Sequence, residues 1–443
     1  MNKTRKNKQL PKIHGKIIEK IQGWKKIHVY GDPYERGFAH GFLLSKELKR
    51  IKKSLPFWVN EILKKPFDEY LKINKKIMFP ILQKKFPEYW EEIYGIHIGA
   101  KYAGVNISMN HLIGWNATMS LYSYFIEGKM KGKEQENETI QRCSAFIATG
   151  DATMDGKIVM AHNVHSDLLT GQLLNIIMKI TPTNGHEFTM QTSAGLISSV
   201  ADWYISSNGI VCCETTISNI NYKPIFGVPF FCRIRQAIQY AKSLDECSKI
   251  MLKENAGDYA CSWLFGDLNT NEIMLLEIGK DIHNIEMTKN GIFYGMNSAI
   301  DYKLRLKETN DIDFNDTSTR CGNRNYRLNE LLNNKYYGKI NISNAKKIMS
   351  DHYDIQLAKN VLNRNGICKH PELDPEMNYR PYSCTDGKVT DAKLAKTQNF
   401  YGIFGTSCGK RFFDIKKYVK EHPQHKQWKT VLEDMPIYKW TYL

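Results

Sequence analysis

The pattern of apolar residues changes at Arg142, and this change limits the folds that the chain can adopt. Before Arg142, apolar side chains recur at three- and four-residue intervals, which predicts helices over residues 68–83 and 88–101. After Arg142, short apolar runs alternate with turn residues, which is typical of strands joined by hairpins. We therefore expect an α+β chain, with a mostly helical N-terminal segment over residues 1–142 and a β-rich domain over residues 143–443.

The β-rich part contains short runs that we interpret as strands of largely antiparallel sheets. They cover residues 143–149, 157–163, 173–180, 187–191, 209–217, 262–267 and 272–278. Runs with helical periodicity stand at residues 233–242, 244–254, 323–332 and 345–350. The spacing of the strands and the hairpin turns between them favour antiparallel pairing.

The sequence indicates a helix start near residue 32. Asp32 is a good N-cap, Pro33 suits the first helical position, and Glu35 completes a capping box. Gly37 and Gly41 stand four residues apart, so they share one face of this helix. Because glycine has no side chain, we expect another element to pack closely against that face.

The net charge of +16 is concentrated in the first third of the chain. Residues 1–142 hold 27 Lys and Arg against 14 Asp and Glu, an excess of 13. We interpret residues 1–20 as a solvated basic arm, and residues 127–142, which are polar and contain glycine, as a linker. A weak attraction of the arm to a membrane surface or to nucleic acid stays open, but no recognition motif predicts a specific nucleic-acid partner.

Ten cysteines are scattered without a C-x-x-C pair, which argues against a zinc ribbon or a thioredoxin-type site. A chain of 443 residues can bury a large core without disulfides, so we interpret most of these cysteines as buried thiols in a reducing compartment. No apolar segment follows the basic N-terminus, so we expect no secretory signal; the location stays unknown, with the cytoplasm as the default. No apolar run approaches the ~18 residues of a membrane-spanning helix.

The run HNVHSD, from His162 to Asp167, could supply metal ligands. On a strand, however, His162 and His165 point to opposite faces, because side chains alternate between the two faces. A zinc site would need further ligands that the sequence does not indicate. We therefore favour a polar, hydrogen-bonded site here and expect neither a metal nor a cofactor.

Cys143 begins an expected strand directly after the polar linker. If this strand pairs with the next one through a hairpin centred near residue 153, Cys143 lies opposite Asn163 and Ser144 lies opposite His162. A cysteine nucleophile needs a base that takes its proton and donors that hold the oxyanion it creates. Cleavage of the chain before Cys143 would free an α-amine that can act as this base. The alternative is that Cys143 is an ordinary buried thiol.

Several short blocks stand in order along the chain. They are Cys143-Ser144-Ala145-Phe146, His162-Asn163, Ile197-Ser198-Ser199, Asp202-Trp203-Tyr204, Gly209-Ile210-Val211, residues 214–219 and residues 385–393. Together these blocks resemble the phospholipase B-like proteins. The earlier run YERGFAHG, residues 34–41, resembles the related acyl-coenzyme A:6-aminopenicillanate acyltransferase group.

The resemblance implies an N-terminal-nucleophile hydrolase, in which antiparallel sheets form an αββα sandwich. It also implies that the chain cuts itself between Arg142 and Cys143, that Cys143 is the nucleophile, and that its freed amine is the base. His162 and Asn163 would belong to the wall of the site. Related enzymes often place an oxyanion-hole Asn where this chain has Thr215, so Thr215 or a nearby backbone amide would take that role.

The resemblance further suggests residues that handle the substrate. Related acylases place Arg and Asp near the nucleophile, and this chain has His162 and His165 at those positions. Arg233 or Arg235 would supply the missing positive charge, unless both belong to an ordinary solvated helix face. The expected substrate-binding residues are His165, Asp167, Trp203, Glu214, Arg233 and Arg235.

These observations predict a hydrolase that cleaves an amide or ester bond of a small acyl or lipid substrate through a thioester on Cys143. A thiolate with an amine base is chemically suited to linear amides, so amide hydrolysis is favoured over phospholipid cleavage. The two parts of the cut chain would stay associated. Two alternatives stay open: an acyltransferase of the same fold, and an inactive relative that binds lipid or another partner.

Overall fold

The computed structural model describes residues 11–126, 143–225, 227–311, 314–373 and 380–443. Its strands form a nine-stranded sheet, a six-stranded sheet and a two-stranded ribbon, with helices around them. The expectation of an α+β chain with mostly antiparallel sheets is confirmed.

The nine-stranded sheet has the order β1-β2-β5-β6-β7-β8-β9-β10-β11. Its strands are β1 (Gly15–Ile21), β2 (Trp24–Gly31), β5 (Ile176–Pro182), β6 (Phe188–Thr192), β7 (Trp203–Ser206), β8 (Ile210–Thr216), β9 (Cys261–Asp267), β10 (Glu272–Ile278) and β11 (His283–Thr288). Neighbouring strands are antiparallel except β2 and β5, which run parallel.

The six-stranded sheet has the order β12-β3-β4-β15-β16-β17 and is antiparallel throughout. Its strands are β12 (Gly291–Gly295), β3 (Cys143–Thr149), β4 (Val159–Asp167), β15 (Tyr382–Asp391), β16 (Tyr401–Phe404) and β17 (Thr441–Tyr442). The ribbon pairs β13 (Tyr353–Asp354) with β14 (Lys359–Asn360).

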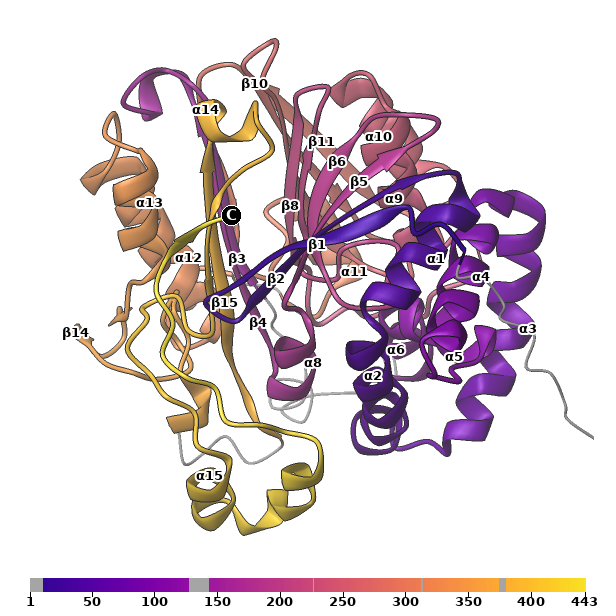
Figure 1. Cartoon of the computed structure of the whole chain (residues 1–443). Helices are drawn as coiled ribbons and strands as arrows, with labels where there is room; N and C mark the ends of the chain where they lie inside the picture. Colours follow the sequence, from indigo (N-terminus) through magenta and orange to yellow (C-terminus); the bar gives the residue numbers. More distant parts are fainter. Residues whose placement is uncertain (1–10, 127–142, 226, 312–313, 374–379) are drawn as a thin grey trace, which may run out of the picture.

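The two large sheets lie face to face at the centre of the molecule (Figure 1). Strands β3, β4, β8 and β9 are buried along their whole length. β9 approaches β3 so closely that a Cβ at Gly266 would stand 2.8 Å from the Cδ1 atom of Ile147. Apolar side chains of both sheets, among them Met160, Val211 and Phe265, therefore share one core.

Helices cover the outer faces of both sheets and one end of the molecule (Figure 1). On the nine-stranded sheet lie α9 (Phe230–Tyr240) and α10 (Leu244–Leu252), and on the six-stranded sheet lie α12 (Arg320–Glu330) and α13 (Ile342–Met349). The N-terminal helices are α1 (Pro33–Leu43), α2 (Ser45–Trp58), α3 (Phe67–Lys85), α4 (Pro87–Tyr102), α5 (Met109–Asn116) and α6 (Thr118–Phe125). Shorter helices are α8 (Leu168–Leu173), α11 (Tyr302–Glu308), α14 (Ala392–Ala395) and α15 (Ile415–Glu421).

Residues 15–31 form strands, whereas the sequence predicted a basic arm followed by helices. They form the hairpin of β1 and β2, and β2 extends the nine-stranded sheet by pairing with β5. Ile27 and Val29 are buried whereas His28 between them is half-buried, so the alternation typical of a strand was present in the sequence. The basic arm predicted over residues 1–20 is therefore wrong from Gly15 onward, and residues 1–10 lie outside the described ranges.

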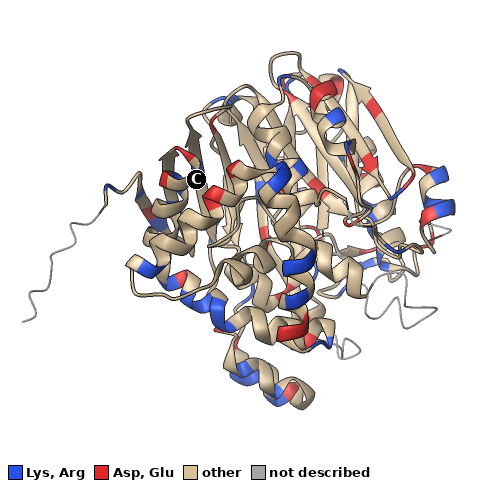
Figure 2. Ribbon diagram, turned by 90° about the vertical axis from the view of Figure 1, so that its right-hand side faces the viewer, with Lys and Arg blue, Asp and Glu red and all other residues tan. Residues whose placement is uncertain are grey.

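The basic charge is also spread beyond the N-terminus. Lys and Arg occur along the N-terminal helices, which face the viewer in Figure 2, with Asp and Glu between them. The predicted linker at residues 127–142 lies outside the described ranges. Among the helices that the structure describes, none has the length and apolar character needed to cross a membrane.

Helix α1 begins at Pro33, as predicted, and packs tightly on α4. Gly37 and Gly41 face that helix, and a Cβ on either glycine would collide with the carbonyl oxygen of Glu92 or Ile96. The predicted glycine face that admits a neighbouring element is confirmed. This close packing places the buried carboxylate of Glu92 beside Arg36 of α1.

Candidate functional site

Strands β3 and β4 form the predicted hairpin, but their register is shifted by one residue from the prediction. Cys143 lies opposite Val164, and Asn163 lies opposite Ser144. Directly opposite residues in an antiparallel pair share a face, and the faces alternate along each strand. Cys143 therefore shares its face with His162 and Val164, while Asn163 points to the other face.

Cys143 belongs to a group of three side chains that meet between the sheets. The thiol sulfur of Cys143, a ring nitrogen of His162 and a carboxylate oxygen of Asp202 lie within 4.8 Å of one another. Cys143 opens β3 and His162 lies in β4, whereas Asp202 immediately precedes β7 of the opposite sheet. All three residues are at most 3% exposed. This Cys–His–Asp group has the side chains needed for proton transfer to and from a thiol, and the same atoms could also bind a metal ion.

The tautomer of His162 follows from its hydrogen bond. Its Nε2 lies 2.9 Å from the backbone carbonyl oxygen of Glu214, which can only accept, so Nε2 carries the proton. Its Nδ1 then presents a lone pair and has no hydrogen-bond partner among the described residues. Burial, with a smaller contribution from Lys388, lowers the pKa of His162 well below its usual value. His162 is therefore a neutral imidazole with an available lone pair.

The backbone of Cys143 is held by Asn297 and Arg324. The N–H of Cys143 donates to Oδ1 of Asn297 at 3.1 Å, and its carbonyl accepts from Nη1 of Arg324 at 2.6 Å. Nη2 of Arg324 donates to the same Asn297 oxygen at 2.9 Å, and Nδ2 of Asn297 donates to the carbonyl of Thr216 at 3.0 Å. These bonds fix the position that an α-amine would occupy if the chain were cut before Cys143.

Lys388 brings a buried positive charge to the layer between the sheets. Its Nζ lies 2.8 Å from Oδ1 of Asp386 and donates to the carbonyl of Ala201 at 2.9 Å. The second oxygen of Asp386 accepts from Nε2 of Gln191 at 2.8 Å. Because Lys388 lies directly opposite His162 in the sheet, the ammonium group is on the face that carries the Cys–His–Asp group.

The thiol of Cys143 is protonated in the uncut chain at neutral pH. Burial raises the pKa of Cys143 well above its usual value, and the charges of Glu214 and Asp202 raise it further. Lys388 and a backbone hydrogen bond from His165 act in the opposite direction but are weaker. The thiol must therefore give its proton to a base before it can attack a substrate.

Asn163 and His165 lie on the other face of β4, away from the Cys–His–Asp group. Nδ2 of Asn163 donates to the carbonyls of Met349 at 2.7 Å and Ile367 at 3.1 Å, and Nε2 of His165 donates to Ile367 at 3.0 Å. The prediction that Asn163 stands beside the thiol is wrong, because a shift of one residue exchanges the two faces of a strand. The expectation that His162 and His165 point to opposite faces is confirmed.

Two predicted substrate-binding carboxylates make other contacts. Asp167 caps α8, accepting from the backbone N–H of Thr170 at 2.8 Å and from its hydroxyl at 2.9 Å. The carboxylate of Glu214 accepts from the hydroxyl of Tyr259 at 2.7 Å, and the link from Glu214 to His162 runs through its backbone carbonyl. The contacts of Asp167 are thus those of a helix cap.

Thr215 and Trp203 reach the layer between the sheets. A Cβ at Gly295, in β12 of the six-stranded sheet, would collide with the hydroxyl of Thr215. That hydroxyl is buried and has no hydrogen-bond partner within the described ranges. The centre of the Trp203 ring lies 6.0 Å from Nζ of Lys388. The predicted roles of Thr215 as an oxyanion donor and of Trp203 in binding substrate stay predictions.

Arg233 and Arg235 do not supply a positive charge beside Cys143. Both are buried in α9, a helix on the outer face of the nine-stranded sheet. Arg233 pairs with Asp258 at 3.0 Å, and Arg235 pairs with Glu92 at 2.9 Å. The alternative of a solvated helix face is wrong, because both side chains are buried, whereas the predicted role in binding substrate stays a prediction. Among the described residues, Arg324 and Lys388 are cations that act on Cys143.

Four residues of this site were not predicted from the sequence: Asp202, Asn297, Arg324 and Lys388. Asn297 follows β12 at a φ of 80°, a backbone conformation that non-glycine residues rarely adopt. Lys388 and Asp202 stand in the blocks that carried the family resemblance, so the resemblance pointed to their segments without singling out these residues. No feature of the sequence pointed to Arg324 as a site residue, apart from its place in the helix predicted over residues 323–332.

One cleft of about 350 Å³ opens elsewhere on the molecule and does not include Cys143. Residues that line it include Cys384, Thr406, Arg411, Phe413 and Tyr418. The Cys–His–Asp group is therefore a buried site without a contact to this cleft. Arg142 and the rest of the predicted linker, which directly precede the thiol in sequence, lie outside the described ranges.

Comparisons with known proteins give distant relatives. No family model matches the chain. An uncharacterized protein of Archaeoglobus fulgidus is 25% identical over 259 residues, which cover 57% of this chain and 42% of the relative. Protein dcd1B of Dictyostelium discoideum is 23% identical over 275 residues, which cover 58% of this chain and 50% of that protein. The matched region spans half or less of the length of these curated relatives.

Two solved structures of a conjugated bile acid hydrolase from Clostridium perfringens also align with parts of the chain. One mutant covers 68% of this chain and 96% of its own, with a TM-score of 0.32 and 10% identity. Another variant covers 60% of this chain and 81% of its own, with a TM-score of 0.27 and 11% identity.

Proposed function

We propose that the chain is a cysteine hydrolase of the N-terminal-nucleophile type, with the αββα sandwich of a phospholipase B-like protein. It cleaves an amide bond of an acyl substrate through a thioester on Cys143. The main support is that Cys143 opens a strand with its thiol beside His162 and Asp202 and with its backbone nitrogen bonded to Asn297. Cys143 would thus supply both the nucleophilic thiol and, after cleavage, the amine that acts as its base.

The proposal includes cleavage of the bond between Arg142 and Cys143 by the chain itself. This cleavage is a hydrolysis that consumes one water: the carbonyl of Arg142 becomes a carboxylate, and the backbone nitrogen of Cys143 becomes an amine, whose unperturbed pKa is near 8. The neutral amine can donate a hydrogen to Oδ1 of Asn297 and use its lone pair to take the thiol proton. Before cleavage that lone pair is part of a peptide bond, so the amine that the proposed reaction uses as its base arises only with the cut.

The proposed reaction has two stages, which are the formation of a thioester on Cys143 and its hydrolysis by water. The amine takes the proton of the thiol, and the thiolate of Cys143 attacks the acyl carbonyl carbon. The carbon–nitrogen bond of the substrate then breaks, and the leaving amine receives the proton. Water attacks the resulting thioester, gives one proton back to the sulfur through the amine, and releases the acid.

Two further groups support charge stabilisation between the sheets. The hydroxyl of Thr215 is buried and has no hydrogen-bond partner in the described part of the chain, so it can donate to an oxyanion. Lys388 carries a positive charge on the face of Cys143, which favours the thiolate.

The two parts of a cut chain would remain together. The part before Cys143 contributes β2, which pairs with β5, and α1, whose Arg36 forms an ion pair with the buried Glu92 on α4. The same Glu92 pairs with Arg235 from the part after the cut. A sheet pairing and a buried ion pair therefore cross the cut.

Trapping the acyl intermediate tests this function. The purified protein is mixed with matched N-acyl p-nitroanilides and p-nitrophenyl esters, quenched in acid, digested, and analysed by mass spectrometry. The acyl group should be found on the peptide that starts at Cys143, and Cys143→Ala should show neither adduct nor turnover. Cys247→Ala, which removes another buried thiol from α10, should keep both.

Turnover that survives in Cys143→Ala, or an adduct on another residue, would overturn the proposed nucleophile. An added amine separates hydrolase from acyltransferase. Release of free acid as the main product supports hydrolysis, whereas transfer of the acyl group to the amine would replace the hydrolase by an acyltransferase of the same chemistry.

A further inference from the structure

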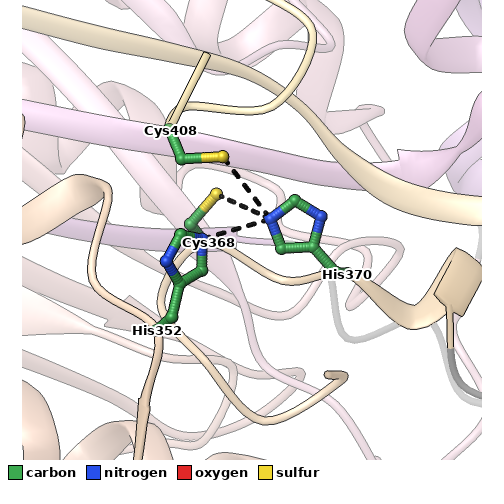
Figure 3. Close-up of side chains that lie close together, drawn as sticks. All are labelled: His352, Cys368, His370 and Cys408. Carbon is green, nitrogen blue, oxygen red and sulfur yellow. Dashed lines mark hydrogen bonds between the residues drawn. The ribbon is translucent and has the colours of Figure 1, made fainter. Parts of the chain in front are cut away.

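Four side chains with metal-binding atoms meet on the outer side of the six-stranded sheet, away from Cys143. They are His352, Cys368, His370 and Cys408, and one ligand atom from each lies within 4.8 Å of the others. The close-up in Figure 3 shows all four pointing toward one another, with Nε2 of His370 at the centre of the contacts. We call them the Cys2His2 cluster.

The distances within the Cys2His2 cluster match the edges of a zinc tetrahedron. Zn–S bonds of about 2.3 Å and Zn–N bonds of about 2.0 Å separate two nitrogens by about 3.3 Å, and a sulfur from a nitrogen by about 3.5 Å. Nε2 of His370 lies 3.2 Å from Nε2 of His352. It lies 3.5 Å from the sulfur of Cys368 and 3.6 Å from the sulfur of Cys408.

Hydrogen bonds alone satisfy this arrangement poorly. Nδ1 of His370 lies 2.9 Å from a carboxylate oxygen of Glu372, which can only accept, so the proton sits on Nδ1. Nε2 of His370 then offers one lone pair or, in the imidazolium form, one hydrogen, whereas three polar atoms lie within 3.6 Å of it. A cation in the centre would use the lone pairs of all four ligands together. The bond from His370 to Glu372 is the carboxylate–histidine contact that commonly orients a metal-bound histidine.

The four ligands come from three separate segments. His352 follows α13, Cys368 and His370 lie between β14 and β15, and Cys408 follows β16. No C-x-x-C pair is involved, which is why the spacing of cysteines in the sequence predicted no metal site. Cys368 and His370 are buried, whereas His352 and Cys408 are partly exposed, so an ion can enter from solvent.

We propose that the Cys2His2 cluster is a structural zinc site. Two thiolates and two imidazoles suit Zn²⁺ and are a poor match for Mg²⁺ or Ca²⁺, which prefer oxygen ligands. Four protein ligands leave no open position for water or substrate, so the ion has a structural and not a catalytic role.

The site would hold a loop against the strand that carries His162. Ile367, next to the ligand Cys368, accepts hydrogen bonds through its carbonyl from Asn163 and His165 on the outer face of β4. His162 lies on the inner face of the same strand, beside Cys143. Loss of zinc should therefore loosen the support of β4 and lower the melting temperature of the whole chain.

Metal analysis of the full-length protein tests the proposal. Protein purified with Zn²⁺ in the medium should contain one zinc per chain. X-ray absorption should show two sulfur and two nitrogen ligands. Removal of zinc by a chelator should lower the melting temperature, and added Zn²⁺ should restore it. Co²⁺ in its place should give the intense visible bands of a tetrahedral site with thiolate ligands.

Variants of single residues show whether the Cys2His2 cluster or another thiol binds the zinc. Cys408→Ser should lose the zinc, whereas Cys247→Ser, at a buried thiol in α10, should keep one zinc per chain. Glu372→Gln keeps all four ligands and should weaken zinc affinity about 10- to 100-fold, because it changes only the partner of His370. This variant keeps the test decisive if a ligand variant fails to fold.

Three results would overturn the proposal. One is purified protein that neither contains zinc nor changes its melting temperature when Zn²⁺ is added. The second is a disulfide between Cys368 and Cys408 found by mass spectrometry in the native protein. The third is bound zinc that Cys408→Ser and Glu372→Gln leave unchanged in amount and affinity.

Discussion

The side-chain oxygen of Asn297 lies 3.1 Å from the backbone nitrogen of Cys143. The same oxygen accepts from Arg324 at 2.9 Å, which also contacts the carbonyl of Cys143. In a chain cut before Cys143, this oxygen would accept one hydrogen of the new amine and thereby orient its lone pair. The charge of Arg324 would at the same time disfavour the protonated amine.

The first prediction concerns the pH dependence of turnover. An amine with an unperturbed pKa near 8, lowered by the neighbouring Arg324, should lose its proton between roughly pH 5 and 8. The value of kcat/KM for an acyl amide should rise over this range, because only the neutral amine can take the thiol proton. A pH profile that is flat across this range would rule out the amine as the base.

The second prediction compares two asparagines. Asn297→Ala removes the acceptor that positions the amine, and a small misplacement of a catalytic group costs about 100-fold in rate. Asn163→Ala removes a side chain on the other face of β4, so kcat of the folded protein should stay close to that of the wild type. It should instead lower the free energy of unfolding by about 1–3 kcal/mol, because it removes buried hydrogen bonds to the carbonyls of Met349 and Ile367.

Kinetics and denaturant unfolding of the two variants check this comparison. A loss of kcat in Asn163→Ala without a loss of stability would return Asn163 to the active site. Wild-type kcat in Asn297→Ala would remove Asn297 from it.

The third prediction concerns the ion pair between Arg235 and Glu92. Arg235→Met leaves a buried carboxylate with Arg36 as its remaining close cation and should cost about 3 kcal/mol in the free energy of unfolding. The folded fraction should keep its activity. Lys249→Ala is a control, because it breaks an exposed pair with Asp245 and should change stability by less than about 1 kcal/mol. A raised KM in a fully stable Arg235→Met would place Arg235 in substrate binding.

The fourth prediction concerns stability at acidic pH. Burial lowers the pKa of His40 from 6.5 to about 4, and its Nε2 accepts from the backbone N–H of Gly195 at 2.8 Å. Between pH 6.5 and about 4, His40 is therefore protonated in the unfolded chain and neutral in the folded chain. The contribution of His40 to stability is complete above pH 6.5 and decreases as the pH falls from 6.5 toward 4.

His40→Gln keeps an acceptor but does not titrate, so its stability should fall less steeply than that of the wild type between pH 6.5 and 4. Denaturant unfolding of both proteins at several pH values measures the difference. Parallel pH profiles would show that His40 does not carry this part of the acid sensitivity.

Local periodicity predicted the elements of this fold well. The strand expected at 143–149 is β3, and the helices expected at 68–83 and 88–101 are α3 and α4 with slightly longer bounds. β2 was missed although its apolar residues alternate, because the basic residues around it suggested a solvated arm. Its pairing with β5 depends on contacts far apart in the sequence, which periodicity does not contain.

The candidate site was predicted only in part. Cys143 and His162 were chosen for their chemistry and lie together, but Asn163 was misplaced because the hairpin turn sets the register and the turn was judged one residue too short. Asp202 reaches the thiol through the packing of the two sheets, and Asn297 reaches the backbone nitrogen of Cys143 through the pairing of β12 with β3. The ligands of the Cys2His2 cluster were likewise unpredictable, because three separate segments supply them.

The mass of the purified chain tests the central claim most directly. We predict that wild-type protein separates under denaturing conditions into two parts, that the larger one begins at Cys143 by N-terminal sequencing, and that Cys143→Ala stays intact. Cys247→Ala, the matched control at another buried thiol, should be cut like the wild type. An uncut wild-type chain that hydrolyses an acyl amide would contradict the account, because the amine proposed as base would not exist.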